Sequence, residues 1–204
     1  MIKAEKISKS FGSKSIISDI SFTVNNGEFL TITGASGCGK STILNILSGL
    51  ISPDSGSVIR TGKRTGYAFQ KDILIPWKSA LENILYIMKG HIPLNQAYDT
   101  AASLLEQIGL ADDMHKKPYM MSGGMKKRVN IARAISIKPD ILLLDEPFAF
   151  LDEKNIEEIK KIILQIQVND DCAVILVNHD NKYADNLPGK TIEITSAGLR
   201  NELT

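Results

Sequence analysis

The chain has 204 residues, of which 43% are hydrophobic and 23% are charged. This composition is typical of a globular protein that buries its core without staples, and it argues against disorder, collagen and disulfide scaffolds. Lys and Arg total 24 against 23 Asp and Glu, so the net charge of +1 gives no support for nucleic-acid binding. No apolar run approaches the roughly 20 residues of a membrane span, and the N-terminus has no signal core. The two cysteines, Cys38 and Cys172, fit no metal motif, so we expect a reducing, cytosolic setting.

The first third of the chain predicts strands and one helix around a glycine-rich turn. Residues 28–33 are expected to form a strand that enters the turn, and residues 41–50 a helix that leaves it. Short strands are expected at 57–60 and 65–69. This order of elements is typical of an α/β protein.

The middle of the chain changes character, because its apolar spacing is helical and no strand signal interrupts it. Three helices are expected there, at 79–89, 96–108 and 123–137. The sequence therefore predicts a single domain, 1–204, in which a helical part of about 71–135 is inserted into a core of about 1–70 and 136–204.

The last third returns to alternating strands and helices. Residues 141–144 and 173–177 are short and wholly apolar, as in central strands of a parallel sheet that is covered on both faces. An amphipathic helix at 156–166 joins them into a βαβ unit. Residues 191–194 are expected to be a last short strand.

The glycine-rich turn matches the phosphate-loop pattern G-x-x-x-x-G-K-[ST]. Its residues are Gly34, Ala35, Ser36, Gly37, Cys38, Gly39, Lys40, Ser41 and Thr42. Glycines let backbone N–H groups converge on phosphates, and the helix N-terminus adds positive potential. We expect Lys40 to reach the β- and γ-phosphates and the Ser41 hydroxyl to bind Mg²⁺. A chance turn is the alternative, and the strand before and the helix after argue against it. Cys38 could be a redox switch, but we favour a small residue at a permissive position.

Two acids, Asp145 and Glu146, follow the apolar strand 141–144. Ligands bind at the carboxyl ends of strands in open α/β sheets. We expect Asp145 to hold Mg²⁺ through water, and Glu146 to orient or activate an attacking water. Solvated acids at a strand end are the alternative, which the phosphate loop makes weaker.

Residues Met121-Ser122-Gly123-Gly124-Met125 lie between the phosphate loop and the acids, and they resemble the signature motif of ATP-binding cassette (ABC) ATPases. A phosphate loop alone would also fit a kinase or a GTPase, but a phosphate loop followed by the signature motif and the two acids does not. The resemblance covers nearly the whole chain. It implies the α/β fold of P-loop NTPases, with a RecA-like core, a small antiparallel β part and an inserted helical subdomain. It also implies ATP hydrolysis with Mg²⁺.

The resemblance extends to isolated positions, which it assigns one by one. Phe11 matches the aromatic residue that stacks on adenine, where Tyr is commoner. Gln70 matches the Q-loop glutamine, which contacts the metal or the attacking water. Asp152 belongs to the D-loop, and His179 matches the switch histidine that hydrogen-bonds the γ-phosphate. Alone, each side chain could be an ordinary core or surface residue.

The resemblance also implies a head-to-tail homodimer, in which each signature segment caps the ATP of the other copy. Ser122 is a suitable N-cap, and Gly123 and Gly124 leave backbone N–H groups open to an anion. In the helix that follows, an apolar stripe is expected at Met125, Val129 and Ala132. The polar side is expected to hold Lys126, Lys127 and Arg128. Ala149 and Phe150 depart from the small residues usual before the D-loop, so Phe150 adds bulk near the expected interface.

Finer detail resembles one branch of the family, the importers of nitrate, sulfonates, taurine and pyrimidine precursors. The stretch from Phe69 to Trp77, FQKDILIPW, carries that likeness. The branch implies a separate transmembrane permease, a substrate-binding protein as an indirect partner, and a peripheral position on the cytoplasmic side of the cell membrane. Trp77 is either an anchor for the permease or a packed residue. Another transporter branch, including an exporter, and a nucleic-acid-linked ABC ATPase are the alternatives.

Overall fold

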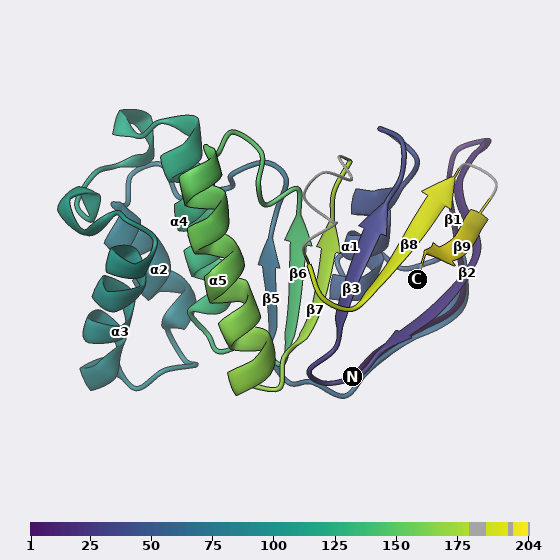
Figure 1. The fold of residues 1–204 in the computed structure, drawn as a ribbon, viewed down its shortest axis with the longest axis horizontal. Coiled ribbons are helices and arrows are strands. Elements are labelled where there is room, and N and C mark those ends of the chain that lie inside the picture. The colour runs from purple at the N-terminus through teal and green to yellow at the C-terminus, as the bar shows by residue number, and fades with distance from the viewer. Residues whose placement is uncertain (180–186, 196–197, 204) are drawn as a thin grey trace.

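The computed structural model describes residues 1–179, 187–195 and 198–203, and shows two sheets with helices packed around them (Figure 1). Within these ranges the larger sheet has the strand order β5-β6-β7-β3-β8-β9 and the smaller sheet the order β2-β1-β4. The strands are β1 (Ile2–Phe11), β2 (Lys14–Val24), β3 (Phe29–Thr33), β4 (Ser55–Arg60), β5 (Thr65–Ala68), β6 (Ile141–Asp145), β7 (Ala173–Val177), β8 (Lys190–Thr195) and β9 (Gly198–Leu203). The helices are α1 (Lys40–Ser48), α2 (Ala80–Met88), α3 (Leu94–Gln107), α4 (Gly123–Ile135) and α5 (Glu153–Asn169). Short 3₁₀ turns lie at Ala111–Asp113 and Pro118–Met120.

The larger sheet is parallel from β5 to β8, and β9 pairs antiparallel with β8. The smaller sheet is antiparallel. Every residue of β3, β6 and β7 is buried, as expected for central strands with both faces covered. The α/β fold with a small antiparallel part, predicted from the sequence, is therefore confirmed.

Alternate residues of the central strands serve two separate hydrophobic cores. In β6, Leu143 packs with α1 and the inner face of the small sheet, which contributes Ile7 and Ile20. Leu142 and Leu144 point to the opposite face, where α4 and α5 pack. The large sheet is thus sandwiched between the small sheet with α1 on one side and the remaining helices on the other (Figure 1).

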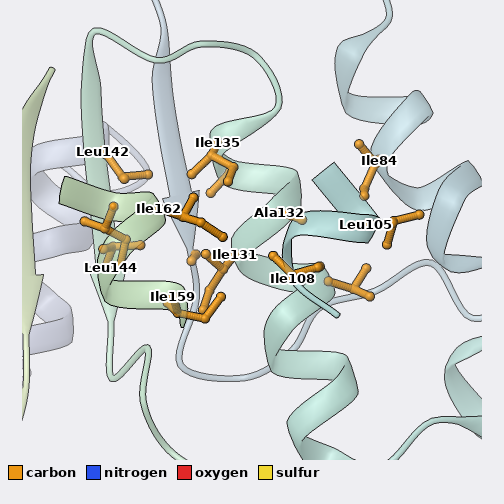
Figure 2. Close-up of a cluster of buried hydrophobic side chains, with 14 of the residues drawn as sticks. Ile84, Leu105, Ile108, Ile131, Ala132, Ile135, Leu142, Leu144, Ile159 and Ile162 are labelled. Atoms are coloured by element: carbon orange, nitrogen blue, oxygen red, sulfur yellow. The ribbon is translucent and has the colours of Figure 1, made fainter. Parts of the chain in front are cut away.

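The predicted helical part packs continuously with the sheet rather than standing apart from it. Figure 2 shows Ile131 and Ile135 of α4 beside Leu142 and Leu144 of β6, with Ile84 of α2 and Leu105 and Ile108 of the α3 region on the far side. Helix α4 therefore lies between the sheet and the helices α2 and α3.

Some elements of the fold differ from those predicted. Strands β1 and β2 were assigned to no element, and 191–194 is not the last strand, because β9 follows β8 in the described residues. The helix predicted at 156–166 is longer, since Asp152 caps it at its start and it runs to Asn169. The remaining predicted elements are present, with ends shifted by one or two residues in most cases.

Candidate active site

Neighbouring strands of the large sheet deliver most of the candidate residues to one edge. The carboxyl ends of β5, β6, β7 and β3 lie side by side, because these strands are parallel and adjacent. The chain leaves β5 toward Gln70, β6 toward Glu146, β7 toward His179 and β3 into the phosphate loop. Residues that are far apart in the sequence are therefore gathered at one place by the topology alone.

The phosphate loop has the conformation that its glycines permit. Gly34, Gly37 and Gly39 all have positive φ angles, of 147°, 77° and 104°. At Gly34 a Cβ would lie 2.3 Å from the carbonyl oxygen of Ile194, so only glycine fits there. Gly39 precedes α1 and offers no side-chain cap, which leaves the first N–H groups of the helix free to meet an anion.

Lys40 is nearly buried and folds back across the loop that precedes it. Its Nζ donates hydrogen bonds to the carbonyl oxygens of Gly34 at 2.7 Å and Ala35 at 2.9 Å. The Sγ of Cys38 lies 4.0 Å from the same nitrogen. The ammonium group is thus held at the phosphate loop by acceptors that a phosphate oxygen could replace.

A cavity of about 280 Å³ opens beside the loop and brings most of the candidate residues together. Its lining residues are Phe11, Ile16, Ser36, Gly37, Gly39, Lys40, Ser41, Thr42, Gln70 and Glu146. Phe11 stands at its edge, 54% exposed, with Lys9 Nζ 5.8 Å from the ring centroid. Ile16, which lies in β2, is not among the predicted site residues. A larger hollow, of about 920 Å³ over β1, β2 and β4, contains none of the candidate residues.

Asp145 is the last residue of β6 and is only 3% exposed. Among the described residues its buried Oδ1 has no hydrogen-bond partner, while the Ser41 hydroxyl interacts with the carboxylate group. Burial raises the pKa of Asp145 above its ordinary value, and the neighbouring Glu146 raises it further, although the Ser41 hydroxyl opposes the shift. A carboxylate with an unsatisfied oxygen beside a hydroxyl is an oxygen donor set of the kind that suits Mg²⁺.

Glu146 is held between Gln70 and His179. Gln70 Nε2 donates to Glu146 Oε2 at 3.1 Å, and His179 Nδ1 lies 3.6 Å from Glu146 Oε1. The backbone of Glu146 has a positive φ of 48°, and its N–H donates to the carbonyl oxygen of Val177 at 2.9 Å. This unusual backbone directs the carboxylate out of the strand and toward the cavity edge. The three residues therefore form one cluster.

The signature segment lies outside this cavity, whose lining includes none of Ser122, Gly123, Gly124 and Asp152. The Ser122 hydroxyl caps α4 by accepting from the N–H of Met125 at 3.2 Å, as predicted. Asp152 caps α5 by accepting from the N–H of Asn155 at 2.8 Å. Within the described residues, Ser122 and Asp152 are thus helix caps, and neither they nor Gly123 and Gly124 line the phosphate-loop cavity of their own chain.

One expectation about α4 is wrong. Lys127 was placed on the polar side of the helix, but its side chain is only 1% exposed. It points toward the segment that follows β5, where it donates to the carbonyl oxygen of Gln70 at 2.8 Å. Lys127 is buried with its charge compensated, because Asp72 lies 3.4 Å from its Nζ. A charged residue next to a signature motif gives no sequence signal for such a contact.

Residues 17–149 match the ABC transporter family. A bicarbonate transport ATP-binding protein, CmpD, from Synechocystis sp. is 40% identical over 206 residues, which cover 94% of this chain and 73% of the relative. A nitrate import ATP-binding protein, NrtD, from Synechococcus elongatus is 39% identical over 88% of this chain and 69% of its own. An aliphatic sulfonates import ATP-binding protein, SsuB 1, from Agrobacterium fabrum is 36% identical over 97% and 72%.

Solved structures agree with these relatives. The dimeric structure of the bacterial ABC transporter cassette MJ0796 superposes with a TM-score of 0.92 at 29% identity, covering 99% of this chain and 97% of that one. A post-hydrolysis dimer of the same cassette, bound to ADP and Pi, gives a TM-score of 0.91 with the same coverage. The chain therefore belongs to the ABC transporter family, as one of its ATP-binding and ATP-hydrolysing cassettes.

Proposed function

We propose that this chain is the ATP-hydrolysing subunit of an importer for a small anion. The support is twofold. Bicarbonate, nitrate and sulfonates, named for the relatives, are all small anions, and the stretch 69–77 resembles that branch. The observation that carries the enzymatic part is the Glu146 carboxylate, which is held by Gln70 and faces His179 at the edge of the phosphate-loop cavity.

The cavity would take the nucleotide in one orientation. The N–H groups of the phosphate loop, from Gly34 to Thr42, and the N-terminus of α1 would bind the phosphates. Lys40 would exchange its carbonyl acceptors for phosphate oxygens. Phe11, exposed at the cavity edge, would stack on adenine, a contact worth about 1–3 kcal/mol.

The residues present fit a magnesium ion bound with the nucleotide. Ser41 would bind it directly, Asp145 would hold it with its otherwise unpaired Oδ1, and Gln70 lies at the same cavity. Bound there, Mg²⁺ would neutralise charge on the β- and γ-phosphates. The orphaned Oδ1 of Asp145 is the feature of this chain that favours such an ion.

Hydrolysis needs a water molecule aligned with the γ-phosphate. Glu146 would orient this water and accept its proton, because its carboxylate stands at the cavity edge. Gln70 would fix one oxygen of Glu146, and His179 would hydrogen-bond the γ-phosphate from the end of β7. Each of these roles corresponds to a side chain that the sheet edge brings into the cluster.

The signature segment would act on the ATP of a second copy. Ser122, Gly123 and Gly124 present the N-terminus of α4 and do not line their own cavity, and Asp152 lies beside them at the start of α5. Phe150 is 83% exposed, and its carbonyl oxygen would lie 3.0 Å from a Cβ on Gly124. A head-to-tail homodimer with two ATP molecules would use all of these surfaces.

A separate transmembrane permease would complete the transporter. Among the described residues, no helix combines the length and apolarity needed to cross a bilayer. Trp77 is 71% exposed, so it is not packed in the helical part and is free to anchor a partner. We place the chain peripherally on the cytoplasmic side of the membrane, with a substrate-binding protein as an indirect partner. We also infer one domain, with the helical part of about 71–135 inserted into the core.

A second transporter class is favoured by one observation. A lipoprotein-releasing system ATP-binding protein, LolD, from Aquifex aeolicus is 35% identical and matches this chain over 98% of its own length. Co-purification with the permease, followed by identification of the permease and of any ligand of its binding protein, separates the two. A permease that responds to a small anion supports import, and one that responds to a lipoprotein overturns it.

The enzymatic assignment is tested with Glu146→Gln, which keeps the side-chain shape and the contact to Gln70. We expect ATP binding to persist while turnover falls about 10²- to 10⁴-fold, the usual contribution of a general base, and an ATP-bound dimer to accumulate on size-exclusion chromatography. Glu157→Gln on α5 makes the same chemical change at an exposed side chain and should leave turnover near wild type. Unchanged ATPase activity of Glu146→Gln would refute the role of Glu146.

A further inference from the structure

Side chains on one face of α4 hydrogen-bond to the backbone of the segment that carries Gln70. Lys127 Nζ donates to the carbonyl oxygen of Gln70 at 2.8 Å and lies 3.4 Å from that of Phe69. Asn130, one turn further along, donates from Nδ2 to the carbonyl oxygen of Phe69 at 2.8 Å. Arg133 continues the row with a hydrogen bond to the carbonyl oxygen of Ile73. Three side chains at helical spacing thus hold a single loop.

Burying the ion pair between Lys127 and Asp72 costs free energy. Lys127 is fully buried, and Asp72, its partner at 3.4 Å, is mostly buried as well. Burial raises the pKa of Asp72, and Lys127 and Asn130 only partly offset that shift. Replacing a buried ion pair by apolar residues of similar size is often neutral or stabilising, so stability alone is a weak reason for this pair. The contacts of Lys127 with the carbonyl groups of Phe69 and Gln70 supply a different reason for a lysine at this position.

The loop that α4 holds contributes Gln70 to the cluster with Glu146 and His179. The backbone of Gln70 is fixed by Lys127, and its side chain donates to Glu146 Oε2 at 3.1 Å. At the other end, Lys127 lies in the second turn of a helix that begins at Gly123 in the signature segment. Lys127 and Gln70 together therefore connect a segment proposed to face a second copy with the Glu146 carboxylate of the chain's own site.

We propose that Lys127 is a positioning residue for ATP hydrolysis, which sets Gln70 on Glu146 and makes the position of Gln70 follow that of α4. The inference rests on the proposed roles of Gln70 and Glu146 and goes beyond them. It requires the carbonyl contacts of Lys127, not merely its charge opposite Asp72. The two requirements are separable, because Asp72 contacts Lys127 while the carbonyl groups belong to other residues.

The experiment compares Lys127→Met, Asp72→Asn and the double variant Lys127→Met/Asp72→Asn. Thermal unfolding, the KM for ATP and kcat are measured for each. Lys127→Met leaves Asp72 buried without its cation, so we expect it to be destabilised, and the double variant should regain most of that loss. The kcat of the double variant should still be about ten- to a hundredfold low, as for a misplaced catalytic group. Its KM should change by about twofold at most, because Lys40 and the phosphate loop are untouched.

Two comparisons keep the proposal refutable even if Lys127→Met does not fold. Asp72→Asn keeps the carbonyl contacts and should hold kcat within about threefold of wild type, whatever its stability. Lys126→Met removes the same charge from the adjacent, half-exposed position and should behave like wild type. A double variant with wild-type kcat, or an Asp72→Asn variant as slow as the double variant, would overturn the proposal. If Glu146→Gln is inactive while the double variant is fully active, only this inference fails. If Glu146→Gln is active, the proposed function fails.

Discussion

Asp145→Asn should make the nucleotide-free protein more stable while weakening its stabilisation by ATP and Mg²⁺. The wild-type carboxylate is buried, its Oδ1 has no partner in the structure, and Glu146 is next to it. An unsatisfied buried group of this kind costs about 1–3 kcal/mol, and more when it is charged. The amide has nearly the same shape and carries no charge, so the part of that cost that comes from burying a charge is relieved. Each kcal/mol raises Tm by about 2–4 °C in a chain of this size.

The sign of the pH dependence follows from the raised pKa of Asp145. Above that pKa the ionised carboxylate opposes folding, so the stability gap between Asp145→Asn and wild type is fully present. As the pH falls through the folded-state pKa, the native wild-type protein binds a proton more readily than the unfolded chain, and the gap shrinks. It then stays constant below the ordinary pKa of aspartate.

The assay is thermal unfolding of both proteins at about pH 8 and about pH 5, first without nucleotide and then with ATP and Mg²⁺. Ligand should raise the Tm of wild type more than that of Asp145→Asn, because tighter binding adds more stability. Asp99→Asn, an exposed aspartate on α3, is the matched control and should leave Tm unchanged. A loss of stability in Asp145→Asn at about pH 8, or a gap that does not shrink with falling pH, would refute the reasoning.

Two further predictions concern nucleotide and dimer contacts. Phe11→Ala should lose about 1–3 kcal/mol of stacking energy, so the Kd for ATP measured by fluorescence titration should rise about 5- to 150-fold. Phe11→Tyr keeps an aromatic ring and should bind ATP like wild type. An unchanged Kd in Phe11→Ala would mean that the ring does not contact the base. Ser122→Arg should weaken ATP-driven dimerisation in analytical ultracentrifugation, because a bulky cation replaces the cap at the start of α4. Nucleotide binding by the monomer should stay within about threefold, as for a substitution away from that site. Dimerisation at wild-type strength would count against a role of Ser122 in trans.

The central strands and the phosphate loop could be predicted because their signals are local. Leu142 and Leu144 lie in a wholly apolar run, and Lys40 lies in a motif whose flanking strand and helix are adjacent in the sequence. The strands β1 and β2 were missed because paired irregularities break their alternation. Lys6 and Asp19 have positive φ angles, and the register shifts between Ala4 and Ile7, so buried residues do not recur at every second position.

Site residues that belong to a sequence motif could be predicted, whereas residues whose positions depend on tertiary contacts could not. Glu146 was predicted from its place after a strand and His179 from the resemblance to the ABC ATPases, and the structure puts the two side chains 3.6 Å apart. Lys127 was misplaced because a lysine is buried only when a partner compensates its charge, and Asp72 is supplied by a distant segment of the chain. Ile16 reaches the cavity from β2, a strand that was not predicted.

The hydrogen bonds that Lys40 makes within its own loop have a consequence for product release. Because its ammonium group already has acceptors on Gly34 and Ala35, a nucleotide does not fill a bonding deficit but swaps one set of oxygens for another. The affinity gained from Lys40 is then only the difference between phosphate and carbonyl acceptors. When product leaves, the ammonium group can return to these carbonyl acceptors instead of being left without a hydrogen-bond partner, so the loss of the phosphate contacts is partly offset.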